Sequence, residues 1–190
     1  MRSTNAIRQQ PPTGRVDVSR FPASRLPELL QALAYLQQSA TMCSVLRRLH
    51  ASGNIVFVTY HPAHTKFLFH NPGNLRIQWN PSLGLQDVTG YLSPAMLLGH
   101  ELGHAQFTPG ERCAMLGCER PQSFQHEAYG VEEACVIATV EQPAARELNA
   151  ARRHVGLTPL ETANRSQHQL GRLIDVSGPL VSPAHLTAVR

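Results

Sequence analysis

The sequence predicts one domain of the α+β class, and three observations carry this prediction. First, 190 residues are enough for a single domain with a sizeable core. Second, three short segments rich in β-branched and aromatic residues indicate strands, at 54–60, 65–69 and 74–79. Third, leucines recur at helical spacing through residues 24–51. We therefore expect a small antiparallel sheet packed against helices.

The two ends of the chain are expected to lie outside this domain, which we place at residues 23–156. Residues 1–22 are polar and contain no acidic residue before Asp17, a composition typical of disordered segments. Residues 157–190 contain several prolines and show weak periodicity. There we expect a C-terminal extension that is partly helical, with one short helix near 163–174 and a loose tail.

The composition excludes several classes of protein. The 17 basic residues are scattered along the chain and no aromatic ladder accompanies them, so we expect no nucleic-acid partner. Four cysteines in a chain of this length do not indicate a disulfide framework. No apolar run approaches the roughly 18 residues of a membrane span, and the N-terminus lacks the apolar region of a Sec signal peptide. We expect a soluble monomer.

A short helix is expected at 93–107, after a loop at 81–92. It carries the residues that could bind a metal or take part in catalysis. Ser93 is a favourable N-cap because its hydroxyl accepts a hydrogen bond from a backbone N–H that otherwise lacks a partner. Pro94 follows at the first helical position, where its missing N–H costs nothing. Pro109 disfavours helical geometry at the residue before it and ends the helix.

This helix contains the pattern His-Glu-x-x-His. His100 and His104 are four residues apart and share a face, where two neutral imidazoles can hold one Zn²⁺. Glu101 lies beside that face and is placed to act as a general base on a water that zinc activates. The surrounding residues are small or apolar, and burying unpaired polar side chains among them would cost a few kcal/mol each. The pattern therefore predicts a zinc peptidase.

The third zinc ligand is expected downstream. Metzincins continue the pattern with a Gly and a third His, but this chain has Phe107 and Gly110 at those positions. A glutamate from a following helix is the other common arrangement. Three candidates follow, and helical periodicity alone does not choose among them: Glu127, Glu132 and Glu133.

The chain resembles a family of zinc metallopeptidases that bacteria deliver by type III secretion, the NleD/XopG/HopH-like effectors. The resemblance covers about residues 50–155. It rests on His100-Glu101-Leu102-Gly103-His104, on the strand at 76–81 and on the Glu132-Glu133 pair that opens an apolar helix. A more distant similarity to clostridial neurotoxin light chains concerns the spacing of this pair.

The resemblance implies a zincin-like fold in which Glu132 is the third ligand and Glu133 its neighbour. It also implies that a later arginine supports the transition state, for which Arg152 and Arg153 are candidates, although no tyrosine follows Tyr129. The 74–79 strand would offer its edge to an extended peptide.

On this basis we expect a zinc-dependent endopeptidase with one catalytic ion. It would be exported by a type III system with residues 1–22 as the export signal, and it would cleave a host protein in the host cytosol. The alternative is an interaction module that binds a host protein and in which zinc only staples the fold. A fourth protein ligand, such as Cys135 or His126, would favour that alternative.

Overall fold

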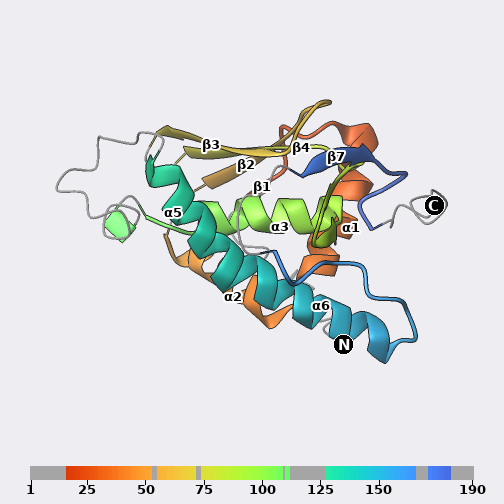
Figure 1. Ribbon diagram of the computed structural model, residues 1–190. Coiled ribbons are helices and arrows are strands. Elements are labelled where there is room, and N and C mark those ends of the chain that lie inside the picture. Colours follow the sequence, from red (N-terminus) through yellow and green to blue (C-terminus); the bar gives the residue numbers. More distant parts are fainter. Residues whose placement is uncertain are drawn as a thin grey trace, which may run out of the picture.

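The computed structural model describes residues 16–52, 55–71, 74–108, 110–111, 127–165 and 171–180. Its central element is helix α3 (Pro94–Ala105), which lies between a sheet on one side and helices α2 (Ala40–Ser52) and α6 (Gln142–His154) on the other (Figure 1). The α+β class is therefore confirmed. None of the described helices is long and apolar enough to cross a membrane.

The larger sheet contains the three strands that the sequence predicts. Its order is β1-β2-β4-β3, with bounds Val16–Asp17, Ile55–Tyr60, Asn74–Trp79 and Lys66–Asn71. The expectation of an antiparallel sheet is correct only for β3 and β4, because β2 runs parallel to both β1 and β4. The inward side chains of β4 are the apolar Leu75, Ile77 and Trp79, all buried, and this strand takes one of the two interior positions.

A second sheet departs from the sequence prediction. Strands β5 (Leu83–Asp87), β6 (Gly90–Leu92) and β7 (Arg172–Asp175) pair in the order β6-β5-β7, where we expected a loop and a short helix. The Asp87 carboxylate closes the β5–β6 turn by accepting hydrogen bonds from the backbone N–H groups of Thr89 and Gly90, at 2.7 and 3.2 Å. This turn chemistry is the signal that our sequence reading missed.

Residues 16–22 also belong to the domain, although disorder was predicted for 1–22. Strand β1 pairs with β2, and the Phe21 side chain is only 6% exposed. The Phe21 ring packs on Trp79 with 5.7 Å between centroids. The predicted disorder is therefore wrong for this part, and residues 1–15 lie outside the described chain.

Helix α5 (Glu127–Val136), the π-helical turn η2 (Ile137–Glu141) and α6 follow one another without a break (Figure 1). Pro143 lies in the first turn of α6 and does not interrupt this continuous helix. Proline lacks an N–H and its ring clashes with the carbonyl four residues earlier in an α-helix. The wider π turn immediately before Pro143 removes that conflict, so the chain continues into α6 with the proline in its first turn.

Two glycines let α3 contact its neighbours closely. A Cβ atom on Gly99 would lie 2.8 Å from a Leu36 methyl carbon, and one on Gly103 would lie 2.9 Å from Val136 Cγ1. Any side chain at these positions would therefore push α1 (Leu26–Leu36) or the α5–η2 segment away from α3.

We predict that Gly103→Ala lowers the free energy of unfolding by about 1–3 kcal/mol, because the added methyl group overpacks the contact with Val136. The matched control is Gly130→Ala in α5, where an added Cβ meets nothing within 4 Å. Alanine there should stabilise the helix by up to about 1 kcal/mol. Urea denaturation of both variants measures the difference, and equal effects at the two glycines would contradict the close-packing explanation.

The start of α3 is anchored by a buried carboxylate from the C-terminal segment. Glu161 Oε2 accepts a hydrogen bond from the Ser93 N–H at 2.9 Å, and Glu161 Oε1 accepts from the Ser93 hydroxyl at 2.6 Å and from the Tyr35 hydroxyl at 3.0 Å. Ser93 Oγ in turn accepts from the Met96 N–H, so it caps the helix as predicted. Part of the expected loose extension thus fixes the position of α3.

Stability is expected to depend on pH through Glu161. Burial outweighs its hydrogen bonds and raises the pKa of Glu161 to about 7, from an ordinary value of 4.5. The folded chain then holds a proton that the unfolded chain releases, so this contribution is complete below pH 4.5 and is lost as the pH rises through 7. Glu161→Gln, which mimics the protonated acid, should match the wild type near pH 5 and exceed its stability at pH 8 by about 3 kcal/mol. Denaturation at the two pH values tests this, and a constant difference would refute it.

Candidate metal centre

Three buried side chains from two helices converge on one point. His104 Nε2 lies 3.1 Å from His100 Nε2 and 3.0 Å from Glu133 Oε2, and His100 Nε2 lies 3.2 Å from the same oxygen. All three residues are at most 5% exposed. Helix α3 supplies the two imidazoles from adjacent turns, and α5 supplies the carboxylate. These three residues can hold a metal ion.

The surroundings of the two imidazoles favour a cation at this point. His104 Nδ1 lies 2.9 Å from Glu132 Oε1, and His100 Nδ1 lies 2.8 Å from Glu141 Oε2, so each ring has a carboxylate on its far side. With ring protons on Nδ1, both Nε2 lone pairs face the Glu133 carboxylate. With protons on Nε2 instead, two N–H groups meet at 3.1 Å. The first arrangement sets lone pairs against a carboxylate, and the second sets two N–H groups against each other. A single metal ion between the Nε2 atoms and the carboxylate removes both repulsions, as in carboxylate–histidine–metal sites.

The structure places the two adjacent acids differently from what the resemblance implies. Glu133, not Glu132, joins the imidazole Nε2 atoms, whereas Glu132 contacts His104 from behind. Adjacent helical residues differ by about 100° in direction, so only one of them can point at the group. Glu127, the third candidate, begins α5, but its side chain lies outside the described part of the chain.

The carboxylates shift the pKa values of the group strongly. Burial alone would lower the pKa of His100, but Glu133 and Glu141 outweigh burial and raise it to about 10. The pKa of His104 is also raised against burial, by Glu132 and Glu133. Burial would raise the pKa of Glu133, yet the two imidazoles hold it well below its usual range. Metal binding must displace these protons, so metal affinity is expected to rise with pH.

Glu101 lies beside the group and is held by the neighbouring strand. Its Oε2 atom accepts a hydrogen bond from the Phe67 N–H of β3 at 2.8 Å, and its charge contributes to the raised pKa values of His100 and His104. The Phe67 ring stacks on His104 with 6.0 Å between centroids. One oxygen of Glu101 is thus held by the backbone of β3.

The strand next to this group is β3 and not the expected 74–79 strand. Strand β4 has hydrogen-bonded neighbours on both sides, so it has no edge to offer. Strand β3 forms the edge of the described sheet, and its Phe67 N–H points away from β4 toward Glu101. An extended peptide beside the group would therefore add to β3.

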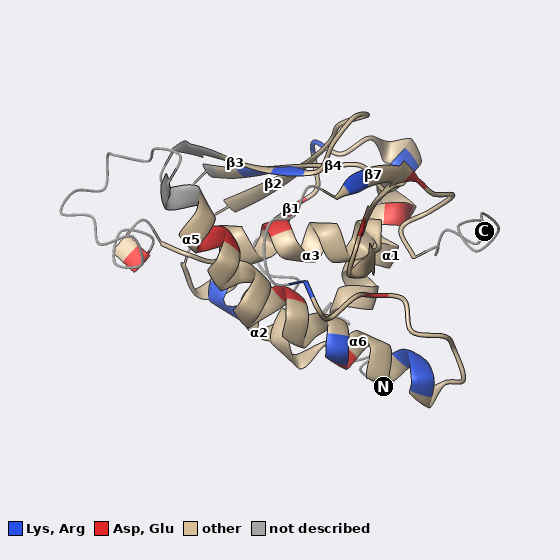
Figure 2. Cartoon of the chain, in the orientation of Figure 1, with Lys and Arg blue, Asp and Glu red and all other residues tan. Residues whose placement is uncertain are grey.

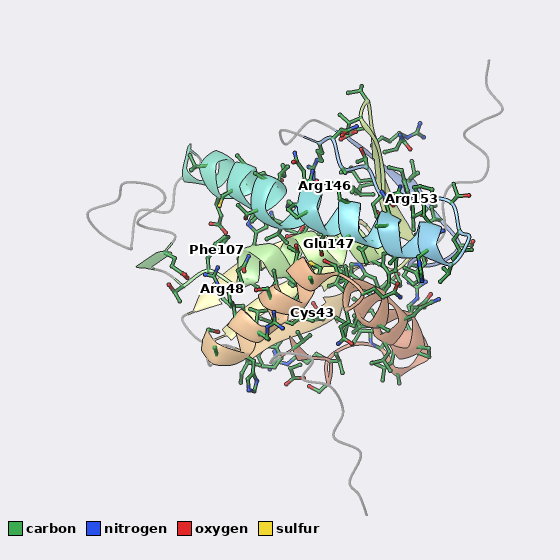
Figure 3. All side chains as sticks on the ribbon, turned by 90° about the horizontal axis from the view of Figure 1, so that it is seen from below. Cys43, Arg48, Phe107, Arg146, Glu147 and Arg153 are labelled. Atoms are coloured by element: carbon green, nitrogen blue, oxygen red, sulfur yellow. The ribbon has the colours of Figure 1, made fainter. Side chains whose placement is uncertain are left out.

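The arginine that approaches the group is one that the sequence did not single out. Arg152 and Arg153 lie in the last turn of α6, and Arg152 Nε donates to the Thr158 carbonyl. Figure 3 shows Arg153 near the end of α6 that is farther from α5. Arg165 instead is 2% exposed and places Nη1 2.7 Å from Glu141 Oε2 and Nη2 3.7 Å from Glu133 Oε1. It follows α6 in an irregular segment, where no periodicity could have indicated its position.

The group that can hold a metal ion comprises three side chains in the described part of the chain. Cys135, a possible fourth ligand of a structural site, is half-buried on α5 and does not join the group, and His126 lies outside the described residues. Acidic positions lie on adjacent stretches of α3 and α5 (Figure 2), so the centre is rich in negative charge.

No protein-family model, no curated protein and no solved structure matches this chain. The function is therefore inferred from the residues and their geometry.

Proposed function

We propose that the chain is a zinc endopeptidase with a zincin-like catalytic domain. One observation carries the proposal: His100, His104 and Glu133 form a metal-binding group, and Glu101 lies beside this group with its carboxylate held by the Phe67 N–H. A purely structural site would have no use for a base in that position.

The donor set fits zinc. Two imidazole nitrogens and one carboxylate oxygen are a common ligand set of catalytic zinc. Ligand atoms about 2.0–2.1 Å from a tetrahedral ion lie about 3.3 Å apart. The three separations here are 3.0, 3.1 and 3.2 Å, so the side chains are close to the required spacing.

The residues around the group then have distinct roles in peptide hydrolysis. Zinc, when bound, supplies a Lewis acid that polarises the scissile carbonyl and lowers the pKa of water. Glu101 accepts the proton of the attacking water and passes it to the leaving amine. The outer side of β3 aligns the substrate as an extended strand, and Phe67 connects this strand to Glu101 and His104.

Incubation with a cell lysate tests this function. Zinc-loaded protein should generate new protein N-termini, whereas Glu101→Gln and chelator-treated wild type should generate none. Wild-type protein that binds zinc but yields no new N-termini in lysates or with unfolded protein substrates would contradict an endopeptidase and favour the interaction module.

The resemblance extends the proposal to a type III effector that acts on a host protein in the host cytosol. Because Val16, Asp17 and Phe21 take part in the fold, the segment to remove is residues 1–15 and not 1–22. We predict that a chain starting at Val16 keeps its melting temperature and zinc content but is no longer delivered as a reporter fusion by a type III-competent bacterium. Continued delivery of the shortened chain would refute this part of the proposal.

A further inference from the structure

A buried carboxylate outside the ligand set contacts His100 on the side opposite to the metal group. Glu141 is fully buried, and its Oε2 atom lies 2.8 Å from His100 Nδ1. The contact is close, although its angle departs from that of an aligned hydrogen bond. Glu132 occupies the equivalent place behind His104, at 2.9 Å from Nδ1. The two imidazoles are therefore both backed by acids of the α5–η2 segment.

The π-helical turn η2 explains how Glu141 reaches this place. Glu133 and Glu141 are eight residues apart, and in a regular α-helix their side chains would point about 80° apart. A π turn holds about one residue more than an α turn, and that extra residue corresponds to a rotation of about 100°. Glu141 is thereby brought to within about 20° of Glu133, so that both acids contact the same imidazole from its two sides.

Arg165 fixes Glu141 from behind. Its Nη1 atom lies 2.7 Å from Glu141 Oε2, the same oxygen that faces His100. The same guanidinium lies 3.7 Å from Glu133 Oε1 and 3.8 Å from Asp87 Oδ2. A buried carboxylate is costly without a partner of opposite charge, and arginine is suited to bridging several of them. Arg165 thus gives the buried Glu141 carboxylate a partner of opposite charge and holds it against the ring.

We propose that Glu141, aligned by the π turn and fixed by Arg165, is a positioning residue that holds His100 in the orientation for metal binding. The inference rests on the proposed zinc function. In this arrangement Glu141 keeps the ring proton of His100 on Nδ1 and leaves Nε2 as the ligand atom, as Glu132 does for His104. Removal of an orienting carboxylate of this kind typically lowers metal affinity by about 10–100-fold.

The test measures zinc affinity and ring protonation together. In the zinc-loaded wild type, NMR should show two protected imidazole Nδ1–H signals, one from each histidine. Glu141→Ala should remove the His100 signal alone, Glu132→Ala the His104 signal alone, and each should weaken zinc binding by about 10–100-fold in a chelator competition. If Glu141→Ala fails to fold, Glu141→Gln can be used, because glutamine retains an oxygen acceptor but not the charge. This variant should keep the His100 Nδ1–H signal and should bind zinc more weakly than the wild type, by less than the loss expected for Glu141→Ala.

Glu147→Gln provides the matched control. Glu147 lies on α6, and its carboxylate accepts hydrogen bonds from Ser39 and Thr41 at the start of α2, between α6 and α2 (Figure 3). This substitution should lower the melting temperature without changing zinc affinity or either signal. If both Glu141 variants show wild-type zinc affinity and two Nδ1–H signals, the inference about Glu141 is overturned and the proposed function is not. A wild-type chain that binds no zinc would overturn the proposed function and the inference together.

Discussion

Replacement of Glu101 by glutamine is expected to lower peptide hydrolysis by at least about 100-fold, because general-base catalysis contributes about 10²–10⁴. Glutamine has the same shape and can still accept the Phe67 N–H through its amide oxygen, so strand β3 should keep its position. Since Glu101 is not among the three metal-binding residues, zinc content should stay at the wild-type level. Turnover, zinc content and melting temperature should be measured on the same preparation.

Glu28→Gln serves as the control for charge removal, because Glu28 lies on α1 and pairs with Arg25 near the protein surface. That variant should hydrolyse peptide at the wild-type rate. Loss of zinc in Glu101→Gln would show that Glu101 is a ligand, and undiminished turnover would show that it is not the base.

Replacement of Glu133 by alanine is expected to have the largest effect on metal binding. It removes the carboxylate whose oxygen lies 3.0 and 3.2 Å from the two imidazole nitrogens, and the loss in zinc affinity should exceed the about 100-fold upper range of an orienting residue. Zinc at 100 times its dissociation constant stabilises a folded protein by about 2.7 kcal/mol. The zinc-dependent rise in melting temperature should therefore vanish in this variant.

Glu132→Ala is the internal comparison, because the two acids are adjacent and differ only in direction. It should bind zinc more weakly than the wild type but more tightly than Glu133→Ala. The reverse order would restore the assignment of Glu132 as the ligand, which the resemblance favoured.

Helix α3 could be predicted because the sequence signals that define it are local. Ser93 and Pro94 mark its start, and the four-residue spacing places His100 and His104 on one face whatever the rest of the fold does. Strands β2, β3 and β4 were located for a similar reason, from their β-branched and aromatic composition.

The rest of the centre depends on non-local geometry. Glu132 and Glu133 point in directions about 100° apart around the helix axis. Which of them faces the two histidines depends on how α5 packs on α3, through contacts such as that of Val136 with Gly103. Glu141 reaches His100 only because of a π turn, and Arg165 arrives from an irregular segment. The parallel pairing of β2 with β4 places β3, which lies between them in the sequence, at the edge of the described sheet, and no turn signal specifies that order.

The most direct test of the central claim is X-ray absorption at the zinc edge of the full chain loaded with one equivalent of zinc. We predict a first shell of nitrogen and oxygen atoms only, at about 2.0–2.2 Å, with the outer-shell scattering of two imidazoles. Glu133→Ala should alter this spectrum, because Glu133 completes the group with His100 and His104. A sulfur shell at about 2.3 Å would contradict the account, since it would show a cysteine-bound structural site. Failure of the wild-type chain to bind zinc would contradict it equally.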